Sequence, residues 1–241
     1  IFMADNGPDP NQLPMSEAYR DWYKANYDKV YIEDFEGDYS DMGQKGVYAD
    51  YGPGWAAASA VPGSYYKTFS TEGGLRVPFI VRFPGTVDPG SKIDKFAYVR
   101  DILPTLLELA GVDVPVGTYN GREIYSPDGI SMLPVLKGEL DTVRTEEHPV
   151  GYELAGSSAV FKGRWKLVQN LAPKGTGAWE LYDIEADPSE LYDLASENPD
   201  RVSDMQTFYD QWAEDVNLVA VPEGYNPLEQ TVVNAKRSGG H

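Results

Sequence analysis

The stretch HPVGYELAGSSAVFKGRWKLVQN, residues 148–170, carries the clearest fold signal in the chain. Apolar residues gather in short runs at 149–154, 159–161 and 166–170, and Gly-Ser-Ser and Lys-Gly-Arg turns separate these runs. A fourth run follows a Gly-Thr-Gly turn, at 180–183. Short runs joined by glycine-containing turns are typical of consecutive antiparallel strands. The sequence therefore predicts an antiparallel meander.

A long helix is predicted after the meander, over residues 199–216. Its apolar side chains recur at the spacing that places them on one face of a helix: Val202, Met205, Phe208, Tyr209, Trp212 and Val216. On the other side of the meander, Glu, Asp and Thr accumulate at 140–147, which indicates a boundary. We therefore expect one unit over residues 1–145 and a small domain over residues 146–241.

The first unit has few strand signals. Residues 1–4 read as the end of a buried strand, and residues 79–83 as a second one between prolines. A doubly wound α/β sheet needs several parallel neighbours, so two strands do not complete one. We therefore expect the chain to begin in mid-domain, further strands to come from elsewhere, and exposed strand edges to favour self-association. Helices are predicted at 14–30, 54–61 and 102–110, with a short one in 129–138 and an irregular loop at 34–54.

Composition excludes several classes of function. With 20 Lys+Arg against 38 Asp+Glu, the 241 residues carry a net charge of −18. Such an acidic chain has no basic surface for nonspecific nucleic-acid binding or for anionic lipid. No apolar run approaches the length of a membrane span. The absence of cysteine excludes disulfides, thiolate metal sites and cysteine nucleophiles, and it leaves cytoplasm and periplasm equally open.

Asp5-Asn6-Gly7 directly follows the first predicted strand. Ligand sites of open α/β sheets lie at the carboxyl ends of strands. A carboxylate beside an amide carbonyl offers two oxygens to a hard cation such as Ca²⁺ or Mg²⁺, and a glycine lets the backbone turn sharply beside them. The same tripeptide is also a common turn sequence. The residues by themselves leave a metal site and a simple turn both open.

Lys67 precedes the segment Glu72-Gly73-Gly74-Leu75-Arg76-Val77-Pro78. A lysine near the mouth of such a sheet is a compact positive charge suited to an oxyanion such as sulfate or phosphate, and the alternative is a solvated surface lysine. We expect the segment itself to be structural, with an Arg76–Glu72 pair holding the loop. Asp101 is predicted to cap the helix that follows it. His148 lies in a loop, which favours a structural or solvated role over catalysis.

In order along the chain, several segments resemble the C-terminal half of bacterial arylsulfatases. The match covers almost the whole chain and is weakest at 34–54. The segments are Phe2-Met-Ala-Asp-Asn-Gly7, Tyr66-Lys-Thr-Phe69, Glu72-Gly-Gly-Leu-Arg-Val-Pro78, Asp101-Ile-Leu-Pro-Thr-Leu-Leu-Glu-Leu-Ala-Gly111, Gly151-Tyr-Glu-Leu154, Trp165-Lys-Leu167, Glu180-Leu-Tyr-Asp-Ile184 and Asp187-Pro-Ser-Glu190.

The resemblance implies an alkaline-phosphatase-like α/β sandwich, followed by a small α+β domain with a four-stranded antiparallel sheet and a terminal helix. It also implies that Asp5 and Asn6 bind an active-site Ca²⁺, or Mg²⁺, and that Lys67 contacts the sulfate of a sulfate ester substrate. The family's formylglycine nucleophile is made from the Cys, or Ser, of a Cys-x-Pro-Ser-Arg motif in the N-terminal half, and this sequence lacks that motif. We therefore expect this chain to need that missing half and to be inactive by itself.

Two other interpretations remain open at this point. One is a phosphomonoester or phosphonate ester hydrolase of the same superfamily, which the sequence around Lys67 favours less. The other is a noncatalytic, metal-dependent binding module.

Overall fold

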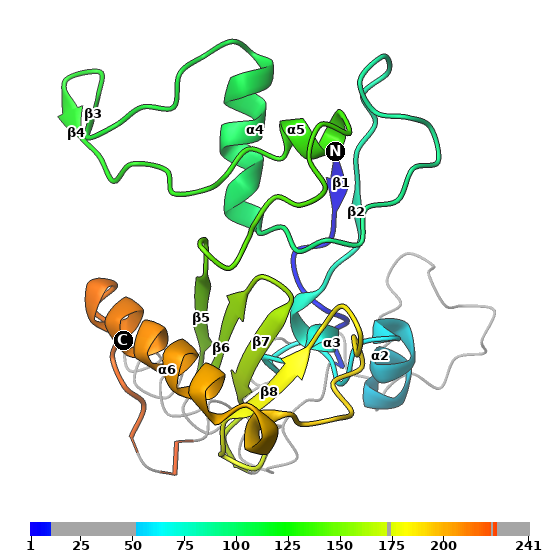
Figure 1. Cartoon of the computed structure of the whole chain (residues 1–241), viewed down its shortest axis with the longest axis vertical. Coiled ribbons are helices and arrows are strands. Elements are labelled where there is room, and N and C mark those ends of the chain that lie inside the picture. Colours follow the sequence, from blue (N-terminus) through cyan, green and yellow to red (C-terminus); the bar gives the residue numbers. More distant parts are fainter. Residues whose placement is uncertain (11–51, 173–174, 223, 226–241) are drawn as a thin grey trace, which may run out of the picture.

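A computed structural model of the chain describes residues 1–10, 52–172, 175–222 and 224–225 (Figure 1). The helix predicted at 14–30 lies outside these residues, as does most of the loop predicted at 34–54. Among the described residues, no helix is both long and apolar enough to cross a bilayer.

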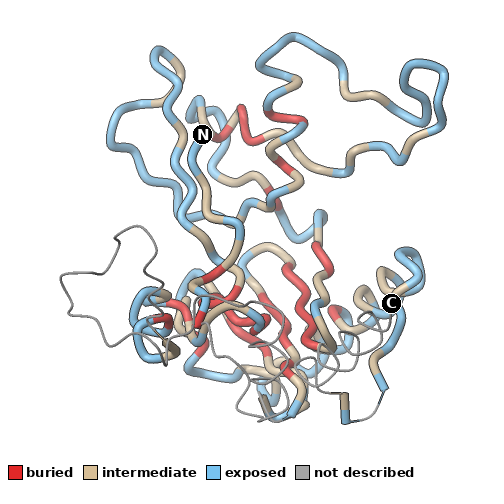
Figure 2. The backbone as a smooth tube through the Cα atoms, turned by 180° about the vertical axis from the view of Figure 1, so that it is seen from behind, coloured by how far each residue is buried: buried red, intermediate tan, exposed pale blue. Residues whose placement is uncertain are grey.

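An antiparallel sheet forms the best-packed part of the described chain. Its strands are β5 (Val150–Leu154), β6 (Ser157–Lys162), β7 (Trp165–Gln169) and β8 (Glu180–Asp183), and each pairs with the next in sequence. The predicted four-stranded meander is confirmed. Figure 2 shows that many of the buried residues lie in these strands.

Both faces of the sheet are covered. On one face, Val160, Leu167 and Leu181 pack against Met205 of α6 (Pro199–Asp215), the predicted terminal helix. Gly151 lets this helix approach closely, because a Cβ at that position would overlap the Trp212 ring. The opposite face packs against residues contributed by earlier parts of the chain, Leu75, Phe96 and Tyr98. The sheet therefore serves as a platform for residues far upstream.

The two predicted buried strands are short and exposed. β1 (Phe2–Met3) pairs antiparallel with β2 (Phe79–Ile80), and Phe2 and Ile80 are 65% and 60% exposed. The expectation of burial is therefore wrong for this pair within the described residues. Apolar side chains of α4 (Ile102–Leu109), the helix predicted at 102–110, are also exposed, among them Leu103 and Leu106.

Asp101 is the N-cap residue of α4, as predicted, but its side chain makes no capping hydrogen bond to that helix. It closes the short 3₁₀ turn η3 (Val99–Asp101), where Oδ2 accepts a hydrogen bond from the Tyr98 amide at 2.8 Å. Oδ1 accepts a bond from the Ile130 amide at 2.8 Å, and Arg144 binds both carboxylate oxygens. The carboxylate thus binds the charged guanidinium of a distant arginine instead of the first turn of α4.

The remaining elements are short. α2 (Gly52–Ala60) and α3 (Glu72–Leu75) lie beside the sheet, and α5 (Leu133–Leu136) falls within the segment predicted to hold a short helix (Figure 1). β3 (Thr118–Tyr119) and β4 (Arg122–Glu123) form a small hairpin, and the 3₁₀ turn η4 (Ala195–Glu197) precedes α6.

Candidate functional site

Two turns that are distant in sequence are joined through their backbones. The amide of Gly7 donates a hydrogen bond to the carbonyl of Gly74 at 3.1 Å, and the amide of Lys67 donates one to Pro8 at 3.0 Å. We call residues 61–71, between α2 and α3, the Lys67 loop. The Asp5-Asn6-Gly7 turn therefore lies directly against the Lys67 loop and the start of α3.

Glycines make this close approach feasible. A Cβ on Gly7 would lie 2.8 Å from the Gly74 carbonyl oxygen, and one on Gly74 would lie 2.8 Å from that of Tyr66. A Cβ on Gly63 would lie 2.5 Å from the Gly73 nitrogen. Real Cβ atoms do not tolerate such distances to backbone atoms. The glycines here serve backbone-to-backbone packing, which supports the prediction that Gly73 and Gly74 are structural.

Asp5 and Asn6 present two oxygens that suit a hard cation. Asp5 is exposed, and its carboxylate accepts no hydrogen bond from a described residue. The Asn6 side-chain nitrogen donates to the Gly7 carbonyl at 2.7 Å, which leaves the amide oxygen free of any donor in the described part of the chain. This donor set fits Ca²⁺ or Mg²⁺. Among the described residues, no group of three or more acidic or histidine side chains is placed to hold a metal ion.

Lys67 is a partly exposed cation at the same place. Its ammonium group forms an ion pair with Asp9 at 2.8 Å, and the two side chains are 38% and 51% exposed. An exposed pair of this kind contributes about 0–1 kcal/mol, so an oxyanion ligand could displace Asp9 at little cost. The structure thus brings Asp5, Asn6 and Lys67 onto adjoining turns.

The predicted Arg76–Glu72 pair is wrong. The Arg76 guanidinium lies 3.8 Å from Asp94, whereas the Glu72 carboxylate turns inward and accepts a hydrogen bond from Lys166 at 2.9 Å. Lys166 in turn lies 2.8 Å from Glu190. We call Glu72, Lys166 and Glu190 the buried ionic cluster.

The buried ionic cluster is almost completely shielded from solvent, and the Lys166 side chain is 0% exposed. Burial opposes the charge on Lys166, but the two carboxylates outweigh burial and raise the pKa of Lys166. Burial also raises the pKa of Glu190, against the lowering effect of Lys166. Lys166 therefore stays charged, and Glu190 is weakly acidic for a glutamate.

The position of Lys166 in its strand is a sequence signal for a buried ionic contact. Lys166 pairs across the sheet with Phe161, and it lies on the same strand face as Val168 because side chains two residues apart share a face. A lysine at an inward position of a buried strand requires an acidic partner. The sequence therefore predicts that Lys166 has an acidic partner, but it does not identify that partner.

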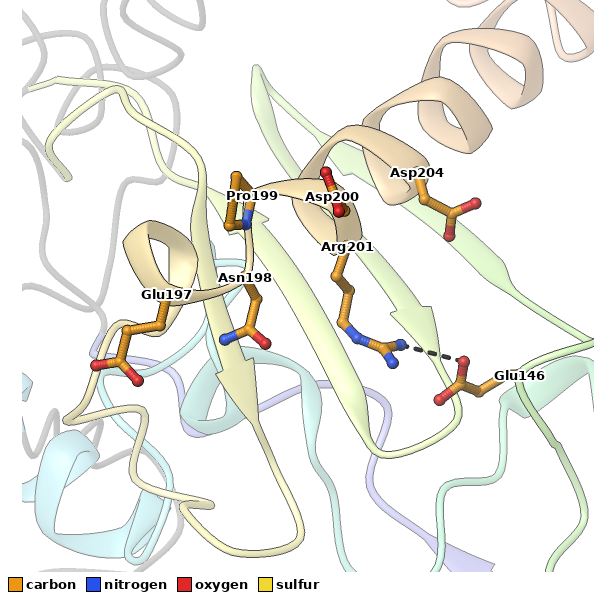
Figure 3. Close-up of a pocket in the computed structure, with 7 residues that line it drawn as sticks. All are labelled: Glu146, Glu197, Asn198, Pro199, Asp200, Arg201 and Asp204. Atoms are coloured by element: carbon orange, nitrogen blue, oxygen red, sulfur yellow. Dashed lines mark hydrogen bonds and ion pairs between the residues drawn. The ribbon is translucent and has the colours of Figure 1, made fainter.

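A polar surface depression lies elsewhere, at the start of α6 (Figure 3). Glu146 and Arg201 face each other across it at 3.1 Å, and the other lining residues are Glu197, Asn198, Pro199, Asp200 and Asp204. None of the predicted site residues lines it. His148 is exposed and lies 3.1 Å from the Thr145 hydroxyl, which agrees with a structural or solvated role.

Two family models match the chain. The model described as "N-sulphoglucosamine sulphohydrolase, C-terminal" matches residues 62–212. The model described as "Sulfatase" matches residues 1–112. Together these matches cover the Asp5-Asn6-Gly7 turn, the Lys67 loop and the sheet.

Individual relatives are longer than this chain. An uncharacterised sulfatase of Schizosaccharomyces pombe is 31% identical over 226 residues, which are 93% of this chain and 39% of that protein. An arylsulfatase of Klebsiella aerogenes is 32% identical over 148 residues, 61% of this chain and 30% of that protein. The solved structure of Ps i-CgsB in complex with k-i-k-neocarrahexaose has a TM-score of 0.54 and 23% identity, and the match covers 75% of this chain and 38% of that one. This likeness concerns the fold. The chain thus spans less than two fifths of the length of these proteins, and it belongs to the sulfatase family.

Proposed function

We propose that this chain forms part of a sulfuric ester hydrolase. In this proposal Asp5 and Asn6 supply two oxygen ligands of an active-site Ca²⁺, or Mg²⁺, and Lys67 contacts the sulfate group of the substrate. The observation that carries the proposal is the hydrogen bond from the Lys67 amide to Pro8 at 3.0 Å, which holds the lysine beside the Asp5-Asn6-Gly7 turn. Membership of the sulfatase family supports the same assignment.

The roles of the side chains follow from their charges. A bound divalent cation supplies charge stabilisation for the oxygens of a transferring sulfate. Asp5 and Asn6 hold such a cation through oxygens that no described residue occupies. The Lys67 ammonium neutralises sulfate or leaving-group oxygens once Asp9 gives it up. The nucleophile must come from other residues, because these 241 residues include no cysteine and no Cys-x-Pro-Ser-Arg motif. We therefore expect no turnover by the chain on its own.

The partner that supplies the nucleophile needs a surface to pack against. Apolar side chains of β1, β2 and α4 offer one, since Phe2, Ile80, Leu103 and Leu106 are exposed. Large exposed apolar patches mark interaction sites. We propose that the N-terminal part of a sulfatase catalytic domain packs here, which would extend the fold into an alkaline-phosphatase-like sandwich. Self-association through the same surface is the alternative.

Replacing Asp5 or Asn6 by Ala should weaken Ca²⁺ binding at least about tenfold, because each change removes a direct oxygen ligand. The measurement is a calorimetric Ca²⁺ titration of the chain complemented with an N-terminal sulfatase part that carries the Cys-x-Pro-Ser-Arg motif. Asp94→Ala is the matched control, since it removes an exposed carboxylate that is 3.8 Å from Arg76. Unchanged Ca²⁺ affinity in both variants would remove the metal assignment.

Replacing Lys67 by Met should lower kcat/KM for p-nitrophenyl sulfate about 10²-fold in the complemented enzyme, because a preorganised positive charge at the transferring group is lost. Lys95→Met is the control. Lys95 is a similarly exposed lysine in an ion pair of the same length, 2.8 Å to Glu185. Equal kinetics for the two variants would contradict the sulfate-contacting role of Lys67. Full turnover by the uncomplemented chain would contradict the expectation of an external nucleophile.

A further inference from the structure

Three of the segments that resemble arylsulfatases meet inside the molecule. Glu72 begins α3, Lys166 lies in β7, and Glu190 ends the Asp187-Pro-Ser-Glu190 turn. They are joined by the Lys166 ammonium, 2.9 Å from Glu72 and 2.8 Å from Glu190. The proposed function gives no role to this buried ionic cluster.

The buried ionic cluster fixes the orientation of Glu72 as well as its position. Glu190 Oε2 accepts a hydrogen bond from the Glu72 amide at 2.7 Å, while Lys166 binds the Glu72 side chain. Glu72 is therefore held at both its backbone and its carboxylate. It is also the first residue after the Lys67 loop, so the end of that loop has a defined position and orientation.

The Lys67 loop is also tied to the C-terminal part of the chain before and after Lys67. The Ser64 hydroxyl donates to the Ser189 carbonyl, and the Ser189 hydroxyl donates to Pro62 at 2.7 Å. The Ser70 amide donates to Asn170 Oδ1 at 2.9 Å. These bonds come from the loops that follow β7 and β8 of the sheet.

The backbone around Lys67 needs such support. Tyr65 and Thr68 have φ values of 60° and 80°, in the left-handed region that residues with a side chain rarely adopt. Residues persist there when the surrounding structure determines their conformation. The contacts from residues 170, 189 and 190 hold positions 62, 64, 70 and 72, on either side of these two residues.

We propose that Lys166, through Glu72 and Glu190, is a positioning residue for Lys67. The C-terminal sheet thereby helps to position the ammonium group of Lys67, which contacts sulfate in the proposed function. The role of Lys67 in this inference rests on the proposed function. The structural coupling between the buried ionic cluster and the Lys67 loop can be tested independently of that function.

Hydrogen exchange of the 241-residue chain tests the link. Lys67 and Phe69 are the reporters, because their amides donate within this region, to Pro8 at 3.0 Å and to Tyr66 at 3.2 Å. In Glu190→Gln and in Lys166→Met we expect both amides to exchange at least about tenfold faster, with the amides of β6 unchanged. Lys162→Met is the control: it is the same substitution on the neighbouring strand, where the lysine pairs with exposed Asp204 at 2.5 Å. It should leave the reporters unchanged.

Two results would overturn the proposal. One is unchanged exchange at Lys67 and Phe69, and the other is an equal acceleration of the reporters and β6, which signals general destabilisation only. Glu190→Gln keeps the shape of the side chain, so it decides the outcome if Lys166→Met does not fold.

Kinetics of the complemented enzyme provide the second readout. Glu190→Gln should raise KM for p-nitrophenyl sulfate and lower kcat, while Lys162→Met leaves both unchanged. Identical kinetics in these two variants would contradict the positioning role. If Lys67→Met also retains full turnover, the proposed function itself has failed, whereas accelerated exchange at the reporters would still establish the link.

Discussion

Replacing Arg144 by Met should lower the free energy of unfolding by about 3–5 kcal/mol. The guanidinium binds both oxygens of Asp101, and the two side chains are only 4% and 0% exposed. Without Arg144, a charged carboxylate stays buried with the amides of Tyr98 and Ile130 as its remaining partners. Urea unfolding followed by tryptophan fluorescence measures the change.

A matched surface variant separates burial from charge. Arg76→Met removes an arginine that is 48% exposed and 3.8 Å from Asp94, so we expect a change below about 1 kcal/mol. The double variant Asp101→Asn with Arg144→Met should be more stable than Arg144→Met, because it leaves no buried charge. A loss below 1 kcal/mol in Arg144→Met would show that Asp101 does not need its partner.

Replacing Gly73 by Ala should cost about 3 kcal/mol, at the upper end of overpacking penalties. The added Cβ would overlap the carbonyl oxygens of Ser64 and Tyr65 and lie 2.7 Å from the carbonyl carbon of Ser64. All of these are backbone atoms, so relief requires the Lys67 loop to move away from α3. The same variant should therefore also accelerate exchange of the Lys67 amide.

Gly54→Ala is the control for this substitution. Gly54 lies in α2, and a Cβ there would meet no atom within 4 Å. We expect it to stabilise the chain by about 0.5–1 kcal/mol, since alanine favours helix more than glycine does. Equal stability of the Gly73→Ala and Gly54→Ala variants in thermal unfolding would refute the close-packing account of this region.

The meander and the terminal helix were predictable because their signals are local. In β6 and β7, alternate residues face opposite sides of the sheet, and the apolar stripe centred on Met205 covers one of these faces. Burial of β1 and β2 was not predictable. An apolar stretch indicates a strand that packs against other apolar residues, but it does not indicate whether those residues belong to the described part of the chain.

The ionic contacts show a similar limit. Asp101 stands at a position that suits a helix cap, yet its carboxylate is bound by Arg144, 43 residues later. The spacing of Glu72 and Arg76 predicts a pair four residues apart, but Glu72 binds Lys166, 94 residues away. Local spacing identified both acidic residues as important, but it could not name partners that depend on the fold.

The roles of Asp5, Asn6 and Lys67 remain predictions, but the proximity of their turns is observed. The sequence pointed to Asp5, Asn6 and Lys67, and the structure places their turns side by side through the Lys67–Pro8 hydrogen bond. It gave no indication of Asp9 as the ion-pair partner of Lys67, or of the support from Ser189 and Asn170. These contacts join residues that are 58, 127 and 100 positions apart, so no short motif encodes them.

The bond between the Glu72 amide and Glu190 has a consequence for biosynthesis. A ribosome must add 118 further residues after Glu72 before the acceptor exists. Domains fold as units while the chain emerges from the ribosome. The Asp5-Asn6-Gly7 turn and the Lys67 loop therefore leave the exit tunnel long before Glu190 does. A nascent chain halted before Glu190 would therefore carry the candidate site without this hydrogen bond.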